Sequence, residues 1–103
     1  MLEKIGLTQS EIEEITEKFD DNLLKTMIEE ETLFLENYYI FKKYNFDYIN
    51  EIVVYFLPIF TNDSLYLENK LKELITELGE EYLDKIGEDL TLLEVLLWLN
   101  ILS

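Results

Sequence analysis

The chain has 103 residues and an apolar fraction of 49%, so one compact domain with a sizeable core is expected. It contains no histidine, cysteine or arginine, which excludes imidazole bases, thiolate nucleophiles, disulfides and nearly all zinc or copper sites, and removes the side chain that dominates specific nucleic-acid contacts. The 23 acidic residues and eight lysines give a formal net charge of −15, which opposes binding to DNA or RNA and favours encounter with basic protein surfaces.

The sequence shows neither a secretory signal nor a membrane span. Its N-terminal segment lacks a basic region followed by an apolar one, and its longest apolar run, residues 52–60, is far shorter than the roughly 20 residues that a spanning helix needs. A soluble, cytoplasmic protein is expected. The richness in isoleucine, asparagine, lysine and tyrosine suggests an A/T-rich genome, such as that of a low-GC bacterium or its phage.

The first predicted helix covers about residues 9–19. Thr8 and Glu11 have the spacing of a capping box, and Ile12, Ile15 and Phe19 then share one face. Residues 20–22, Asp-Asp-Asn, break the pattern and can cap the next helical segment.

A short helical turn at residues 23–28 and a long helix at residues 29–45 are expected next. The long helix has glutamates at its start and Lys42 and Lys43 at its end, as the helix dipole favours. Its apolar positions are Leu33, Phe34, Tyr38, Phe41 and Tyr44.

The next segment predicts a helix over residues 48–56, with Asp47 as its N-cap, that stops before Pro58. Residues 57–60 can make one further turn, and residues 61–64 form a cap cluster. Residues 65–79 give the clearest helical pattern in the chain, with Gly79 as its terminator.

The last segment predicts a short helix over residues 80–86, which Gly87 weakens or ends, and a final helix over residues 92–102. Thr91 and Glu94 have the spacing of a second capping box. The final helix is apolar nearly all round, which indicates burial on most sides or an exposed stripe that dimerises or docks on a partner. In the latter case the candidate interface residues are Trp98, Leu99 and Leu102.

An eleven-residue pattern recurs at residues 9–19, 46–56 and 80–90, each time with large apolar residues at the same spacing of three and then four. Spacings of this size are typical of stacked helical repeats. The predicted fold is therefore all-α, a single domain over residues 1–103 with five or six helices. Its units would be about 8–45, 46–79 and a truncated 80–103, unless the recurrence is a chance product of amphipathic helices.

The second unit resembles the helical repeats of mitochondrial transcription termination factor proteins, in which a short helix leads to a proline-bearing turn and a longer helix ending near Leu-Gly. The resemblance covers roughly residues 9–90 as a pattern, and Asp21 and Leu92 stand where the other units would have proline. It implies a stacked helical fold. Nucleic-acid binding is not carried over, because the chain has no arginine and no basic groove. The matching residues are Ile49, Ile52, Phe56, Pro58, Leu71, Leu74, Leu78 and Gly79.

No segment matches a catalytic or metal-binding motif. Residues 20–31 have acids or amides at three positions of a calcium loop, but Leu24 and Lys25 stand where a ligand and the turn glycine are needed. The many carboxylates include no pair that the sequence marks as buried or specific. We therefore expect neither an enzyme nor a cofactor or metal site.

A protein-binding role is the leading hypothesis. Acidic residues gather at positions 20–21 and 29–31, and tyrosines, which are enriched at protein interfaces, are abundant. The adjacent Tyr38 and Tyr39 can hardly both face one core, so one of them is expected at the surface. The expected partner is a protein with a basic surface, and the sharpest version is a DNA mimic that inhibits a nucleic-acid enzyme, of the phage anti-defence type. The alternative is a self-associating scaffold that uses the apolar C-terminal helix. The candidate partner-binding residues are Asp20, Asp21, Glu29, Glu30, Glu31, Tyr38 and Tyr39.

Overall fold

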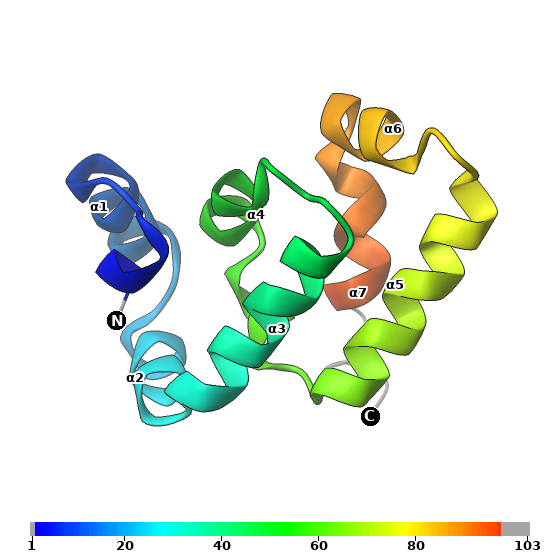
Figure 1. Cartoon of the computed structure of the whole chain (residues 1–103). Helices are drawn as coiled ribbons and strands as arrows, with labels where there is room; N and C mark the ends of the chain where they lie inside the picture. Colours follow the sequence, from blue (N-terminus) through cyan, green and yellow to red (C-terminus); the bar gives the residue numbers. More distant parts are fainter. Residues whose placement is uncertain (1, 98–103) are drawn as a thin grey trace.

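The computed structural model describes residues 2–97, and every regular element among them is a helix, as the sequence predicts. The described residues form seven α-helices, more than the five or six that the sequence predicts, and three 3-10 helices. Short connections join them (Figure 1). The α-helices are α1 (Gln9–Lys18), α2 (Asp21–Glu29), α3 (Glu31–Lys43), α4 (Ile49–Tyr55), α5 (Ser64–Leu78), α6 (Tyr82–Glu88) and α7 (Glu94–Leu97). The 3-10 helices are η1 (Leu2–Ile5), η2 (Leu57–Thr61) and η3 (Leu90–Leu93).

Side-chain caps start three of the helices where the sequence predicts them. Thr8 Oγ1 accepts from the Glu11 backbone N–H at 3.2 Å, and the Glu11 carboxylate accepts from the Thr8 N–H at 2.9 Å, which completes the capping box of α1. Asp20 caps α2 and Asp63 caps α5 by one bond each, since their carboxylates accept from the backbone N–H groups of Leu23 and Tyr66. The Asp20 cap extends the expected short turn into α2, a full helix of nine residues.

The predicted Asp47 cap is wrong. Helix α4 begins at Ile49, Tyr48 occupies the N-cap position, and no side chain caps this end. The chain turns sharply before it, because Asn45 adopts a positive φ of 69° and the Ile49 N–H donates to the carbonyl of Phe46. Helix α4 then ends before Pro58, and η2 follows as the predicted further turn.

The second predicted capping box is also wrong. Thr91 lies inside η3, and the carboxylate of Asp89 caps this 3-10 helix by accepting from the Thr91 N–H at 3.1 Å. Gly87 does not end α6, which continues to Glu88. Because the Asp89 carboxylate accepts from the Thr91 N–H, the helical segment starts two residues earlier than predicted. Thr91 therefore lies inside the segment and not at its N-cap position.

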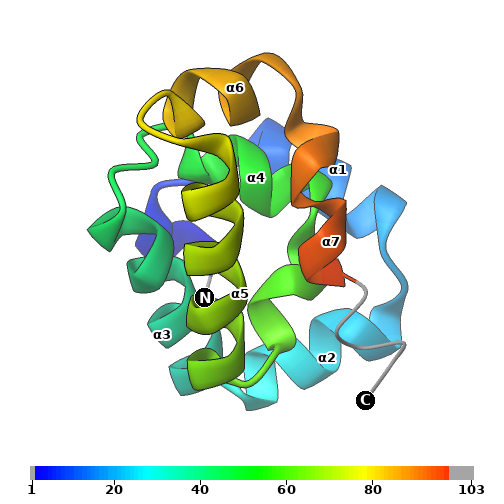
Figure 2. The ribbon, with the colours of Figure 1, turned by 90° about the vertical axis from the view of Figure 1, so that its right-hand side faces the viewer.

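The core forms where α3 packs against η2 and α5 (Figure 2). Phe60 of η2 lies between two phenylalanines of α3, with ring centroids 5.5 Å from Phe34 and 5.4 Å from Phe41. Phe46 extends the cluster at 5.3 Å from Phe41, and all four rings are buried. The apolar run around Pro58 therefore forms part of the hydrophobic core, where its large aromatic side chains are removed from water.

Each short helix buries the central residue of the recurring apolar pattern. Ile15 of α1, Ile52 of α4 and Ile86 of α6 are all fully buried. In chain order a short helix is followed by a turn or short helix and then by α3, α5 or α7. Whether these units are true repeats stays a prediction. The described residues have a radius of gyration of 13.2 Å, as expected for one compact body of this length, and contain no helix long and apolar enough to cross a membrane.

Candidate functional site

The lysines neutralise only a small part of the acidic surface. Within residues 2–97, three of them form ion pairs: Lys4 with Glu31 at 2.6 Å, Lys43 with Glu68, and Lys70 with Glu73 at 3.4 Å. Others are used differently, since the ammonium groups of Lys18 and Lys42 lie over tyrosine rings and that of Lys85 donates to a backbone carbonyl.

Most carboxylates therefore remain without a counter-charge. These acidic residues are exposed, and none of them forms a hydrogen bond or an ion pair through its side chain with another described residue. Such carboxylates stay hydrated and are free to interact with a cationic surface. They are Glu13, Glu14, Glu17, Asp21, Glu29, Glu30, Asp47, Glu51, Glu77, Glu80, Glu81, Asp84, Glu88 and Glu94.

The acidic residues that the sequence singles out do not form one cluster. Asp20 and Asp21 lie at the start of α2, whereas Glu29 and Glu30 lie at its end, about 12 Å further along the helix axis. Asp20 is engaged as the cap of α2, and Glu31 is paired with Lys4. Because residues 21–29 are helical, their side chains radiate from the axis and do not surround a common point as calcium ligands would.

The two adjacent tyrosines differ in exposure, as the sequence predicts, although their rings touch edge to face at 5.5 Å between centroids. Tyr39 is 60% exposed. Tyr38 is buried, and its hydroxyl donates to Asn50 Oδ1 at 3.1 Å, so it is withdrawn from the set of partner-contact candidates. The burial of Tyr38 follows from its place on the core side of α3, beside Phe34 and Phe41.

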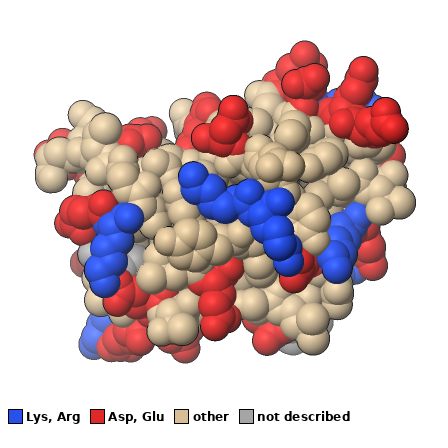
Figure 3. All heavy atoms as spheres, viewed as in Figure 1, with Lys and Arg blue, Asp and Glu red and all other residues tan. Residues whose placement is uncertain are grey.

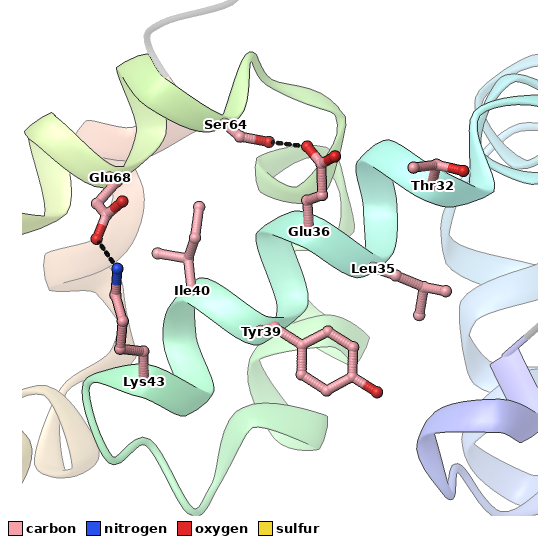
Figure 4. A pocket seen from close by; sticks show the side chains of 8 residues that line it. All are labelled: Thr32, Leu35, Glu36, Tyr39, Ile40, Lys43, Ser64 and Glu68. Atoms are coloured by element: carbon pink, nitrogen blue, oxygen red, sulfur yellow. Dashed lines mark hydrogen bonds and ion pairs between the residues drawn. The ribbon is translucent and has the colours of Figure 1, made fainter.

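Tyr39 lies in a groove between α3 and α5 with a volume of about 620 Å³. Two polar bridges cross it, Ser64 Oγ donating to Glu36 at 2.8 Å and the ion pair of Lys43 with Glu68, and Ile40 points into the space between them (Figure 4). Hydrogen bonds, first from Lys43 and then from Tyr44, hold the pKa of the Glu68 carboxyl below its ordinary value. The lining residues are Thr32, Leu35, Glu36, Tyr39, Ile40, Lys43, Ser64 and Glu68.

A second acidic surface, which the sequence reasoning missed, lies where α4 meets α6. Asp47 and Glu51 are spaced four residues apart along one segment, and Asp84 and Glu88 have the same spacing along the other. The hydroxyl of Tyr48 joins the two helices by donating to the carbonyl of Leu83 at 2.6 Å. Figure 3 shows acidic side chains along the upper edge of one face, where Figure 1 places α4 and α6.

Carboxylates of both segments lie close enough to the hydroxyl of Tyr48 to affect its pKa. Burial, followed by the negative charges of Asp47 and Asp84, raises the pKa of the Tyr48 hydroxyl to about 12. A shift of this direction is expected where carboxylates from two helices approach one phenol. The spacing of four between Asp84 and Glu88 on α6 could have indicated one row of acids. The sequence does not show that Asp47, which precedes α4, and Glu51 meet that row.

Buried amides form a further group that the sequence did not indicate. Asn37 is fully buried, and its Nδ2 donates to the carbonyls of Phe60 at 2.9 Å and Asn62 at 2.8 Å. Asn62 is also buried and donates to the carbonyl of Ile59. These amides hold the end of η2 against α3, so their role is structural.

The apolar C-terminal segment is only partly described. Within α7, Leu96 is buried whereas Val95 is 54% exposed. The predicted interface residues Trp98, Leu99 and Leu102 lie outside the described residues, so their role stays a prediction.

The described residues contain no group of three or more acidic side chains placed to hold a metal ion. Comparison of the chain with protein-family models, curated proteins and solved structures finds no match. The resemblance to the mitochondrial transcription termination factor repeats therefore stays a prediction, and the case for function depends on the geometry and charge described above.

Proposed function

We propose that this protein is a non-catalytic binding module that presents its exposed carboxylates to the basic surface of another protein. The observation that supports this best is the large set of exposed carboxylates that have no counter-charge within residues 2–97. Surface charge of one sign attracts an oppositely charged partner and raises the rate of encounter.

The surface available to a partner combines charge with aromatic area. Tyr39 is exposed in the α3–α5 groove, next to Glu36. It lies on α3, which begins directly after the unpaired Glu29 and Glu30. Tyrosine supplies apolar contact area and a hydroxyl at low entropic cost, so it is suited to the centre of an interface with a charged rim.

The sharper form of the proposal is a DNA mimic that occupies the phosphate-binding surface of a nucleic-acid enzyme. Carboxylates four residues apart on a helix are about 6 Å apart along the axis, compared with one phosphate charge per about 3.4 Å along a DNA strand. One helical row is therefore sparser than one strand. Carboxylates of two segments that meet, as Asp47 and Glu51 meet Asp84 around the hydroxyl of Tyr48, bring the charge density closer to that of DNA.

Several properties favour binding over catalysis. The chain has no histidine or cysteine, and the carboxylates without partners are all exposed. Acid–base catalysis by carboxylates depends on an enclosed site that shifts their pKa values apart. An exposed carboxylate can still attract a cation, so the arrangement is suited to recognition.

The test is capture of partners from the lysate of a low-GC bacterium by the immobilised protein, at about 0.05 M and about 0.5 M salt, where screening differs strongly. We expect a basic nucleic-acid-binding protein that is retained at low salt and released by high salt or by excess duplex DNA. Failure to retain any protein in a salt-dependent way would contradict the proposal. Release by salt but not by DNA would leave an acidic binding module and overturn the mimic.

Two matched triple variants locate the surface. Asp21→Asn with Glu29→Gln and Glu30→Gln removes three charges near α2, whereas a second triple removes three charges near the end of α5. Both variants have the same net charge, so a difference in retention reports position and not total charge. The second triple is Glu77→Gln, Glu80→Gln and Glu81→Gln.

Self-association through the C-terminal segment is the alternative function, and the exposure of Val95 on α7 favours it. It expects a dimer in size-exclusion chromatography that persists at high salt and is lost in Trp98→Asp. A monomer at all concentrations tested would exclude it.

A further inference from the structure

A groove at the junction of α1, α4 and α6 has features that the proposed function does not use. It has a volume of about 530 Å³ and is formed by three segments that are far apart in the sequence. Figure 1 shows α4 between α1 and α6 along this edge of the molecule. The lining residues are Lys18, Glu51, Tyr55, Phe56, Gly87, Glu88, Asp89, Leu90 and Thr91.

The groove combines an accessible aromatic ring with an excess of negative charge. Tyr55 is 45% exposed. The carboxylates of Glu51, Glu88 and Asp89 line the same groove, and Lys18 is the one cation among the lining residues. The lining therefore has a net negative charge beside a π surface, which is the chemical environment that attracts an organic cation.

The side chain of Lys18 already shows how a cation fits there. Its Nζ lies 4.2 Å from the centroid of the Tyr55 ring, a favourable cation–π distance. Lys18 is exposed and forms no ion pair with another described residue. Its ammonium is therefore held mainly by the ring and the local field, and a competing cation can replace it at small cost.

The carboxylates are arranged for an incoming cation rather than for a bound metal. Asp89 is oriented by the Thr91 N–H, whereas Glu51 and Glu88 have no partner among residues 2–97. The described residues contain no set of three acids close enough to coordinate a metal ion. Carboxylates spread around a groove are suited to the several N–H donors of a lysine or, better, an arginine side chain.

We propose that the groove at the α1–α4–α6 junction binds a lysine or arginine side chain of a partner protein, which stacks on Tyr55 and displaces Lys18. This inference rests on the proposed function in assuming a basic partner, and it names the point on the surface where that partner is anchored. A peptide segment with a protruding basic side chain has the matching charge and shape. Lys18 then acts as an internal placeholder that covers the ring in the free protein.

The experiment is a titration of the isotopically labelled protein with tetra-arginine and tetralysine peptides, followed by amide NMR, with tetraglutamine as the neutral control. We expect chemical-shift changes concentrated on Tyr55, Gly87, Glu88 and Thr91. Lys18→Met keeps an unbranched side chain, one atom shorter, and removes the charge. It is expected to raise affinity about two- to five-fold, the size of one exposed cation–π contact.

Two control variants separate the groove from general charge effects. Lys25→Met removes one exposed positive charge from α2 and should raise affinity less than Lys18→Met. Tyr55→Leu should lower affinity about two- to five-fold, whereas Tyr66→Leu, which removes a tyrosine of α5 that is 44% exposed, should leave it unchanged. Circular dichroism of each variant checks that the fold is kept.

The outcomes distinguish the groove from the acidic surface as a whole. If the shift changes spread over all acidic helices and Tyr55→Leu binds like the wild type, the groove is not the binding site. The proposed function is then unaffected. The absence of salt-dependent binding of either charged peptide would overturn both. Changes that depend on Tyr55 and Lys18 support the groove.

Discussion

The buried amide of Asn37 should be one of the strongest polar contributors to stability, and Asn37→Ala tests this. The substitution removes two hydrogen bonds, to the carbonyls of Phe60 and Asn62. Each bond contributes about 1 kcal/mol net, and a buried group left unpaired costs about 1–3 kcal/mol. Asn37 Oδ1 is buried and accepts no hydrogen bond from the described residues, so its removal recovers part of that cost. We expect a loss of about 3 kcal/mol in the free energy of unfolding.

Urea denaturation followed by far-UV circular dichroism measures this loss. Asn37→Leu is the second variant, because it fills the space of the amide but cannot donate to either carbonyl. Asn69→Ala, an exposed asparagine of α5, is the control and should change stability by less than about 0.5 kcal/mol. If both Asn37 variants lose less than about 1 kcal/mol, the two hydrogen bonds do not contribute as argued.

Four further predictions concern backbone conformation and titration. Gly79→Ala should destabilise by about 1–3 kcal/mol because Gly79 has φ 84° and ψ −163°, whereas Gly87→Ala, inside α6, should raise the thermal midpoint because it gains up to about 1 kcal/mol of helix propensity. Lys43→Met should cost about 0.5 kcal/mol at neutral pH. The pKa of Glu68 is lowered in the folded state. The difference in stability between wild type and Lys43→Met, measured by urea denaturation, should therefore vanish as the pH falls below 4.5 and through the folded-state pKa of Glu68. The pKa of Tyr48 is raised from 10.0 to about 12. The contribution of its hydroxyl to the free energy of unfolding should therefore be intact below pH 10 and lost as the pH rises through 12. Phenolate absorbance that rises for every tyrosine near pH 10 would contradict this.

Features of the fold that depend on neighbouring residues could be predicted from the sequence. Thr8 and Glu11 are three residues apart and bond only to each other's backbone, so the motif alone is sufficient. The stop before Pro58 has the same local character. The Thr91 motif failed for a local reason too, because Asp89 stands two residues upstream and takes the Thr91 N–H first.

Features that depend on distant segments could not be predicted. Nothing near Asn37 indicates that its amide will meet carbonyls more than twenty residues away. The meeting of α4 with α6, and the approach of Lys18 to Tyr55, depend equally on how the helices pack. The sequence shows that carboxylates are abundant, and only the packing shows which of them share a surface.

The acidic surface also destabilises the folded state. Measuring stability and partner binding together therefore distinguishes acids that serve binding from acids that serve only solubility. Exposed carboxylates without counter-charges repel one another, so neutralising them should raise the thermal midpoint, as should added salt. An acid whose neutralisation raises stability and leaves partner binding intact serves only solubility. An acid whose neutralisation raises stability but weakens binding is kept for the partner at a cost to the fold. We expect the second behaviour at Glu51 and Glu88, which face the Tyr55 groove, and the first at Glu77 and Glu80, which do not.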